Sequence, residues 1–125
     1  MHKRYLDCDA SELRDISKKD LLDSIRGSEG RILVSETIGT VQPLLHNISN
    51  AELAASQGAD ILLLNMFDVD NPILNGLPEK TKPQEVIKVI EYLTGRVVGV
   101  NLEPVDHKQN EKIKDFWSLT NGAPS

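Results

Sequence analysis

Residues 59–68 read Ala-Asp-Ile-Leu-Leu-Leu-Asn-Met-Phe-Asp, and this stretch decides the fold. The aliphatic run from Ile61 to Leu64 is typical of a strand in a parallel sheet, where both faces of the strand are buried. The polar residues Asn65 and Asp68 follow directly. The stretch therefore predicts a buried parallel strand with polar side chains at its carboxyl end.

Two similar stretches lie on either side of this one along the chain. Residues 31–38 (RILVSETI) and 96–100 (RVVGV) are short, apolar and rich in β-branched side chains, as strands are. Between the first and second strands, Ser49 and Glu52 have the spacing of a capping box that begins a helix. Gly58 then ends that helix. The sequence thus predicts a strand, a helix and a second strand.

The same alternation continues to the third strand. Pro83 suits the first turn of another helix, and Gly95 suits its end. Strands that alternate with helices are parallel and are joined by right-handed crossovers. We expect a single α/β domain over residues 1–125. It comprises a helical cap (1–30), βα units (31–106) and a polar tail with a short helix (107–125).

The expected fold class is a partial (β/α)8 barrel with three parallel strands and an N-terminal capping helix. A complete barrel needs eight strands and at least about 200 residues, whereas the chain has 125. The sequence therefore predicts the N-terminal part of a barrel, with two open sheet edges and an apolar inner face in contact with water. Such surfaces drive association, so we expect a homo-oligomer. A small complete flavodoxin-like domain is the alternative, and it requires more strands.

Composition and charge bear on location and partners. The formal net charge of −5 argues against a nucleic-acid partner, which needs a basic surface. The apolar run from Ile61 to Leu64 is too short to cross a membrane, and no signal peptide precedes the first helix. We expect a cytoplasmic protein with no membrane partner.

Polar residues at the strand ends are the candidate site. The carboxyl ends of parallel strands meet at one edge of the sheet, where ligands of such folds bind. Carboxylates there can act as general acid and base if their surroundings separate their pKa values. Their oxygens also suit Mg²⁺ as a possible cofactor, although we assign no metal ligand. Polar residues at strand ends also cap helices or bond loop backbone, and that alternative stays open. The candidate catalytic residues are Glu36, Asp68 and Glu103, and the candidate substrate-binding residues are Thr37, Asn65, Asn75, Gly76 and Asn101.

Four short motifs carry a resemblance to a known family. They are SET (35–37), LNMFD (64–68), NGLP (75–78) and NLEP (101–104). From about residue 5 to about residue 106, the chain resembles the N-terminal part of an uncharacterised bacterial family of barrel proteins with phosphonomutase-like or haloacid-dehalogenase-like labels. The resemblance implies a TIM barrel more than twice as long as this chain, and it implies no particular reaction.

Two classes of function follow from these observations. The first is a barrel enzyme, or a fragment of one, that acts on a small phosphorylated or carboxylated metabolite through the acids and amides at the strand ends. The second is a non-catalytic truncated module that associates with itself or with a partner chain through its open sheet. The sequence leaves both open.

Overall fold

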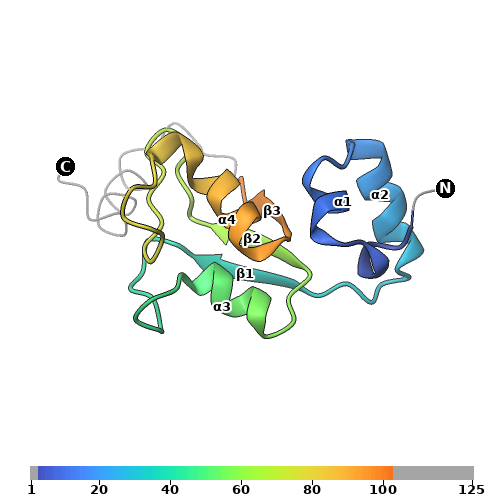
Figure 1. Ribbon diagram of the computed structural model, residues 1–125, viewed down its shortest axis with the longest axis horizontal. Helices are drawn as coiled ribbons and strands as arrows, with labels where there is room; N and C mark the ends of the chain where they lie inside the picture. Colours follow the sequence, from blue (N-terminus) through green and yellow to red (C-terminus); the bar gives the residue numbers. More distant parts are fainter. Residues whose placement is uncertain (1–2, 103–125) are drawn as a thin grey trace, which may run out of the picture.

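A computed structural model describes residues 3–102 and confirms a mixed α/β architecture with one parallel sheet (Figure 1). The strands follow one another in space in the order β1-β2-β3. The strands are β1 (Val34–Ile38), β2 (Ile61–Asn65) and β3 (Val97–Val100). β1 begins three residues later than its apolar run and β3 one residue later, whereas β2 begins at Ile61, where its aliphatic run begins.

Helices join the strands as the alternation predicted. α3 (Asn50–Ser56) connects β1 to β2, and the short 3₁₀ helix η2 (Pro83–Glu85) leads into α4 (Val86–Thr94), which precedes β3. The Ser49–Glu52 capping box is present: the Glu52 N–H donates to the Ser49 hydroxyl, and the Glu52 carboxylate accepts from the Ser49 N–H. Gly95 ends α4 in the left-handed conformation, with φ of 67°.

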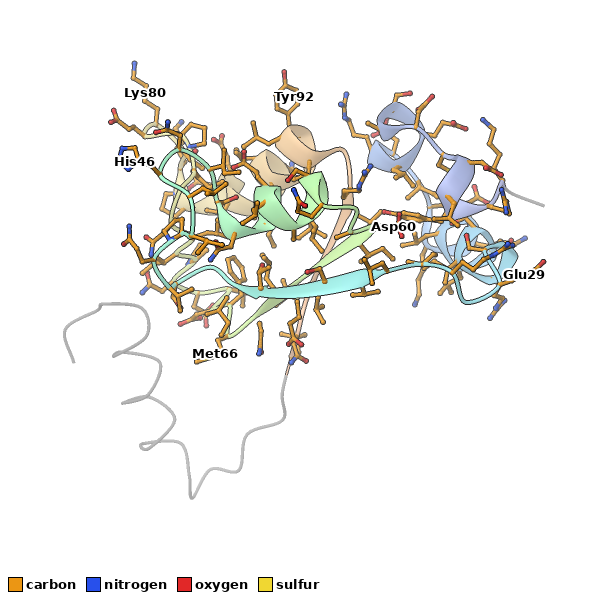
Figure 2. All side chains as sticks on the ribbon, turned by 90° about the horizontal axis from the view of Figure 1, so that it is seen from below. Glu29, His46, Asp60, Met66, Lys80 and Tyr92 are labelled. Atoms are coloured by element: carbon orange, nitrogen blue, oxygen red, sulfur yellow. The ribbon has the colours of Figure 1, made fainter. Side chains whose placement is uncertain are left out.

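One face of the sheet is covered by α3 and α4, which lie on the same side in Figure 2. Right-handed crossovers between neighbouring parallel strands place both helices on that side. The side chains of Leu62 and Leu64 on β2 and Ile90 on α4 are fully buried between the layers. The core consists of Ala51, Ala59, Leu62, Leu64, Phe67, Val86 and Ile90.

The other face, which we call the open face, is not covered by any helix of residues 3–102. Strand side chains alternate between faces, so the neighbours of Leu62 and Leu64 on β2 belong to it. Within residues 3–102 the strands are therefore covered on one face only, and Val34 is 52% exposed. This differs from the burial on both faces that the apolar runs suggest, and it agrees with the expected apolar face in contact with water. The register assigns to the open face Val34, Glu36 and Ile38 of β1, Ile61, Leu63 and Asn65 of β2, and Val97 and Gly99 of β3, with Asn101 just beyond.

The N-terminal helices form a separate unit beside the amino ends of the strands (Figure 1). The unit is anchored by Tyr5, whose side chain is only 3% exposed. Its hydroxyl donates to the carbonyl of Asp60 and accepts from the N–H of Val97 at 3.2 Å, so it joins the starts of β2 and β3. The unit consists of η1 (Tyr5–Asp7), α1 (Ala10–Arg14) and α2 (Lys18–Gly27).

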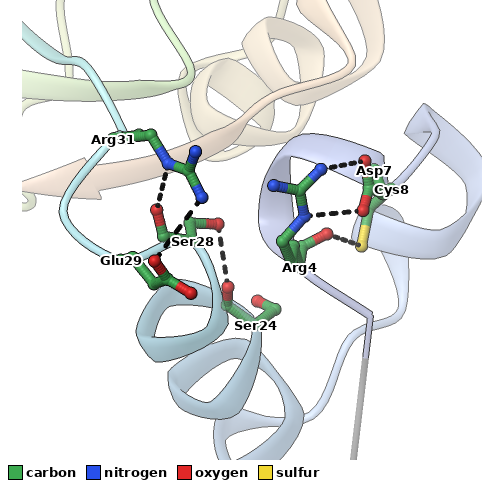
Figure 3. A network of polar contacts seen from close by, with 7 residues as sticks. All are labelled: Arg4, Asp7, Cys8, Ser24, Ser28, Glu29 and Arg31. Atoms are coloured by element: carbon green, nitrogen blue, oxygen red, sulfur yellow. Dashed lines mark hydrogen bonds and ion pairs between the residues drawn. The ribbon is translucent and has the colours of Figure 1, made fainter.

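Short-range polar contacts hold this unit together (Figure 3). Arg4 donates from Nε and Nη2 to the two carboxylate oxygens of Asp7, at 2.8 and 3.0 Å. At the end of α2, the buried Ser28 hydroxyl donates to the carbonyl of Ser24 at 3.0 Å. At the start of α2, the Ser17 hydroxyl caps the helix, because it accepts from the backbone N–H of Asp20 at 3.1 Å. The cap predicted over residues 1–30 is thus helical across most of its described part.

Candidate functional site

Two of the predicted amides meet on the open face, at the carboxyl end of the sheet. The amide nitrogen of Asn101 donates to Oδ1 of Asn65 at 3.3 Å. The same Oδ1 accepts from the backbone N–H of Met66 at 3.0 Å, which fixes the orientation of the amide group. Because both bonds use the oxygen, the Asn65 amide N–H groups are turned away from Asn101 and can donate to a ligand.

Glu36 lies on the same face as these amides, one layer closer to the middle of the sheet. Its register partner is Leu63, two residues before Asn65. Strand spacing of about 4.8 Å and a rise of about 3.3 Å per residue place the Glu36 and Asn65 positions roughly 8 Å apart. The Glu36 side chain is exposed. A small molecule can therefore contact the carboxylate and the amides at once.

Thr37, by contrast, does not face these residues. It pairs in register with the buried Leu64, so it belongs to the face that the helices cover. Thr37 and Glu36 both border a shallow, mostly apolar groove of about 430 Å³ between the outer edge of β1 and α3, where Leu53 also lies. Adjacent residues of one strand point to opposite faces. We predicted Thr37 and Glu36 in one site because they are neighbours in sequence, and that prediction did not take this alternation into account.

Asn75 and Gly76 tie two loops together at the carboxyl end of the sheet. The amide of Asn75 donates to the carbonyl of Thr40 at 3.0 Å, and its backbone N–H donates to the carbonyl of Gly39 at 2.8 Å. Gly76 has φ of 91°, and a Cβ there would lie 2.8 Å from Cα of Ser49. This is the loop-bonding alternative that the sequence left open, and the structure favours it for both residues.

Of the other two predicted acids, only Asp68 lies within the described residues, and its contact is a local one. The carboxylate of Asp68 accepts from the backbone N–H of Asp70 at 2.9 Å and so closes a local turn. Glu103 lies outside the described residues. Residues 3–102 contain no group of three or more His, Cys, Asp or Glu side chains that could hold a metal ion.

A buried and a partly buried titratable group occur at the opposite, amino end of the strands. Burial raises the pKa of the Tyr5 phenol, and the hydrogen bond from the Val97 N–H lowers it in part. Burial also raises the pKa of Glu91 near the end of α4, while the charge of Lys88 lowers it. Our reading of the sequence missed both residues. The signal for Tyr5 was an aromatic side chain within a charged N-terminal stretch, and it is a weak one because Tyr is intermediate in its tendency to be buried.

Comparisons with known proteins identify a family without naming an activity. No helix within residues 3–102 is long and apolar enough to span a membrane. No curated protein and no solved structure matches the chain. A family model described as a domain of unknown function (DUF7916) matches residues 6–124. The match includes most of residues 107–125, which we had expected to be a polar tail. That description names neither a barrel nor a phosphonomutase or dehalogenase relationship. Because the match covers nearly the whole chain, the protein belongs to the DUF7916 family.

Proposed function

We propose that the open face is one wall of a barrel-type enzyme site that acts on a small phosphorylated or carboxylated metabolite. In this proposal Glu36 transfers a proton to or from the substrate, and Asn65 and Asn101 hold it in position. The observation that carries the proposal is the contact between the two amides, at 3.3 Å, on the same uncovered face as Glu36.

The location of the three residues supports a ligand site over a purely structural cluster. Ligands of parallel α/β folds bind at the carboxyl ends of the strands, where Asn65 and Asn101 lie. In a barrel, the face opposite the helices lines the interior. A carboxylate and two amides on an otherwise apolar wall are the few convergent polar groups that a small-molecule site usually contains.

The charge of this wall limits how a substrate can be held. Its strand positions include one acid and no cationic side chain, so a phosphate or carboxylate is bound there through amide N–H groups. Glu36 and the amide oxygens are of the type that Mg²⁺ takes as ligands. The described residues hold no cluster of three acids for such an ion, so we derive no step through a metal.

A ligand-binding experiment tests the proposal directly. Saturation-transfer NMR on the full chain would use glycerol 3-phosphate, 3-phosphoglycerate, malate and succinate as probes. We expect at least one probe to bind, and we expect Asn65→Ala to weaken that binding at least tenfold. Glu36→Gln should preserve folding and alter the affinity.

The matched control is Asn47→Ala, which removes an amide from an exposed loop position. Binding in this variant should equal that of the wild type. If no probe binds, or if Asn65→Ala and Glu36→Gln bind as the wild type does, the proposal fails.

The second candidate function is a non-catalytic module that associates through its sheet. The observation that favours it is the exposure of apolar side chains beside β1 and within it, with Leu33 57% and Val34 52% exposed. Within residues 3–102, β1 and β3 each pair only with β2, so each has an unpaired outer edge. Unpaired edges and apolar faces promote pairing with another chain. A defined oligomer that binds none of the probes would favour this function over the first.

A further inference from the structure

A smaller pocket of about 180 Å³ lies at the amino end of the sheet, between the N-terminal helices and the connection from α4 to β3. We call it the amino-end pocket. It is separate from the open-face site, because Val97, the first residue of β3, borders it, whereas Asn101 lies beyond the other end of that strand. Its walls combine apolar and charged side chains, among them Leu13, Ile16, Leu21, Arg14, Arg96 and Glu91.

Close packing holds the two sides of this pocket together. Gly95 has φ of 67°, and a Cβ at this position would lie 2.8 Å from Cβ of Ala10 on α1. The guanidinium carbon of Arg14 lies 5.9 Å from the centroid of the Tyr92 ring on α4, a cation–π distance. Leu13, also on α1, is buried. The pocket is therefore formed between two elements that are already in contact.

Charges of both signs line the pocket without neutralising one another. Glu91 is partly buried, and that burial raises its pKa. Arg96 uses Nε to donate to the carbonyl of Ala59 at 3.0 Å. Among the ion pairs of residues 3–102, none joins Glu91 to Arg14 or to Arg96. A partly desolvated carboxylate and a guanidinium thus share one pocket while remaining apart, an arrangement that a ligand with both charges would complete.

We propose that the amino-end pocket binds a small aliphatic α-amino acid as a zwitterion. The ligand carboxylate faces the guanidinium of Arg14, its ammonium group faces Glu91, and its side chain packs against Leu13, Ile16 and Leu21. Charge-assisted hydrogen bonds at both ends of the ligand give each wall charge a partner.

Simpler ligands fit the same walls less well. An anion without an ammonium group would pair with Arg14 but would leave Glu91 unpaired beside a second negative charge. An amine without a carboxylate would pair with Glu91 but would be repelled by Arg14 and Arg96. The volume of about 180 Å³ corresponds to roughly six waters at about 30 Å³ each, which suits a molecule of the size of valine.

The experiment compares three probes on the full chain by saturation-transfer NMR and titration calorimetry. L-valine carries both charges, 3-methylbutanoate lacks the ammonium group, and 2-methylpropylamine lacks the carboxylate. We expect valine to bind at least tenfold more tightly than either partial analogue. This comparison uses the wild-type chain, so it does not depend on any variant folding correctly.

Two substitutions then assign the charges. Glu91→Gln should weaken valine binding at least tenfold and strengthen 3-methylbutanoate binding, because the repulsion between two negative charges is removed, and Arg14→Gln should weaken both. The control Arg26→Gln removes an exposed guanidinium from α2, outside the pocket lining, and should change neither. Glu36→Gln should leave valine binding intact, which separates this proposal from the open-face site.

The proposal is overturned if valine binds no more tightly than 3-methylbutanoate, or if Glu91→Gln binds valine as the wild type does. Circular dichroism of each variant establishes that a loss of binding is not a loss of fold. A pocket that holds only water would give no signal with any of the three probes, and that result also overturns it.

Discussion

The two faces of the sheet differ in what covers them. On one face, Leu62 and Leu64 are completely buried beneath α3 and α4. On the other, Val34 is 52% exposed, and Glu36 shares the surface with apolar neighbours. Strands of parallel sheets are normally buried on both faces. Within residues 3–102, the difference therefore distinguishes a face that is finished as a core from one that this part of the chain leaves uncovered.

The largest expected effect is a difference in stability between two variants, each with a leucine on one of the two faces replaced. Leu64→Ala removes a fully buried side chain from the core and should lower the free energy of unfolding by about 3–4 kcal/mol. Leu63→Ala, one residue earlier on the open face, should lower it by about 1 kcal/mol, because its side chain is partly in water already. Urea unfolding followed by circular dichroism measures both. Equal losses would show that the open face is covered as well as the helical face.

The next largest effect concerns the loops beyond the carboxyl ends of the strands. Gly76→Ala should destabilise the fold by about 3 kcal/mol, because φ is 91° and the new Cβ would lie 2.8 Å from Cα of Ser49. Gly58→Ala is the matched control, since its φ is 106° but no atom lies within 4 Å of the added Cβ. It should cost about 1 kcal/mol through backbone strain alone. Thermal unfolding of the two variants provides the comparison, and similar losses would refute the close approach at Gly76.

The amino ends of the strands should show a smaller loss. Tyr5→Phe removes the hydroxyl that bonds the Asp60 carbonyl and the Val97 N–H, and it should cost about 2 kcal/mol. Tyr92→Phe is the control, because the Tyr92 side chain is 73% exposed and its loss of a hydroxyl should change little. Both are measured by urea unfolding. If the two variants are equally stable, Tyr5 does not join the N-terminal unit to the sheet.

The smallest effect is a pH dependence at the amino-end pocket. Burial raises the pKa of Glu91 in the folded chain above its value in the unfolded chain. The folded state therefore loses stability as the pH rises from the unfolded pKa, near 4.5, through the folded one. Glu91→Gln should then melt at a slightly higher temperature than the wild type at pH 7 and at the same temperature below pH 4. The control Glu79→Gln replaces an exposed side chain, and its melting temperature should equal that of the wild type at both pH values. A variant that melts lower than the wild type at pH 7 would contradict the assigned sign.

Local signals in the sequence predicted the elements and their order. The apolar run at Ile61 marked β2, the Ser49–Glu52 box marked the start of α3, and Gly95 marked the end of α4. Each of these signals acts within a few residues. The apolar strand pattern alone did not predict the uncovered face, because it implies that both faces avoid water. The small number of strands did, because three strands leave an apolar face without a second layer.

The candidate site was also predictable only in part. Asn65 and Asn101 were predicted to meet from their positions at strand ends, and they do so at 3.3 Å. Thr37 belongs to the opposite face, which the alternation of strand side chains decides once the register is known. The roles of Asn75 and Gly76 depend on contacts with the loop after β1, far away in sequence. Such long-range contacts leave no local signal to read.

The central claim is that the chain associates with itself through the open face. The solution mass of the full chain, from size exclusion with light scattering, tests this claim most directly. We expect a defined oligomer for the wild type. We also expect a shift towards monomer in Leu63→Lys with unchanged circular dichroism, because a charge within the open face opposes association. A wild-type monomer with a cooperative melt would contradict this claim, because the chain would then be stable without a second copy on its open face.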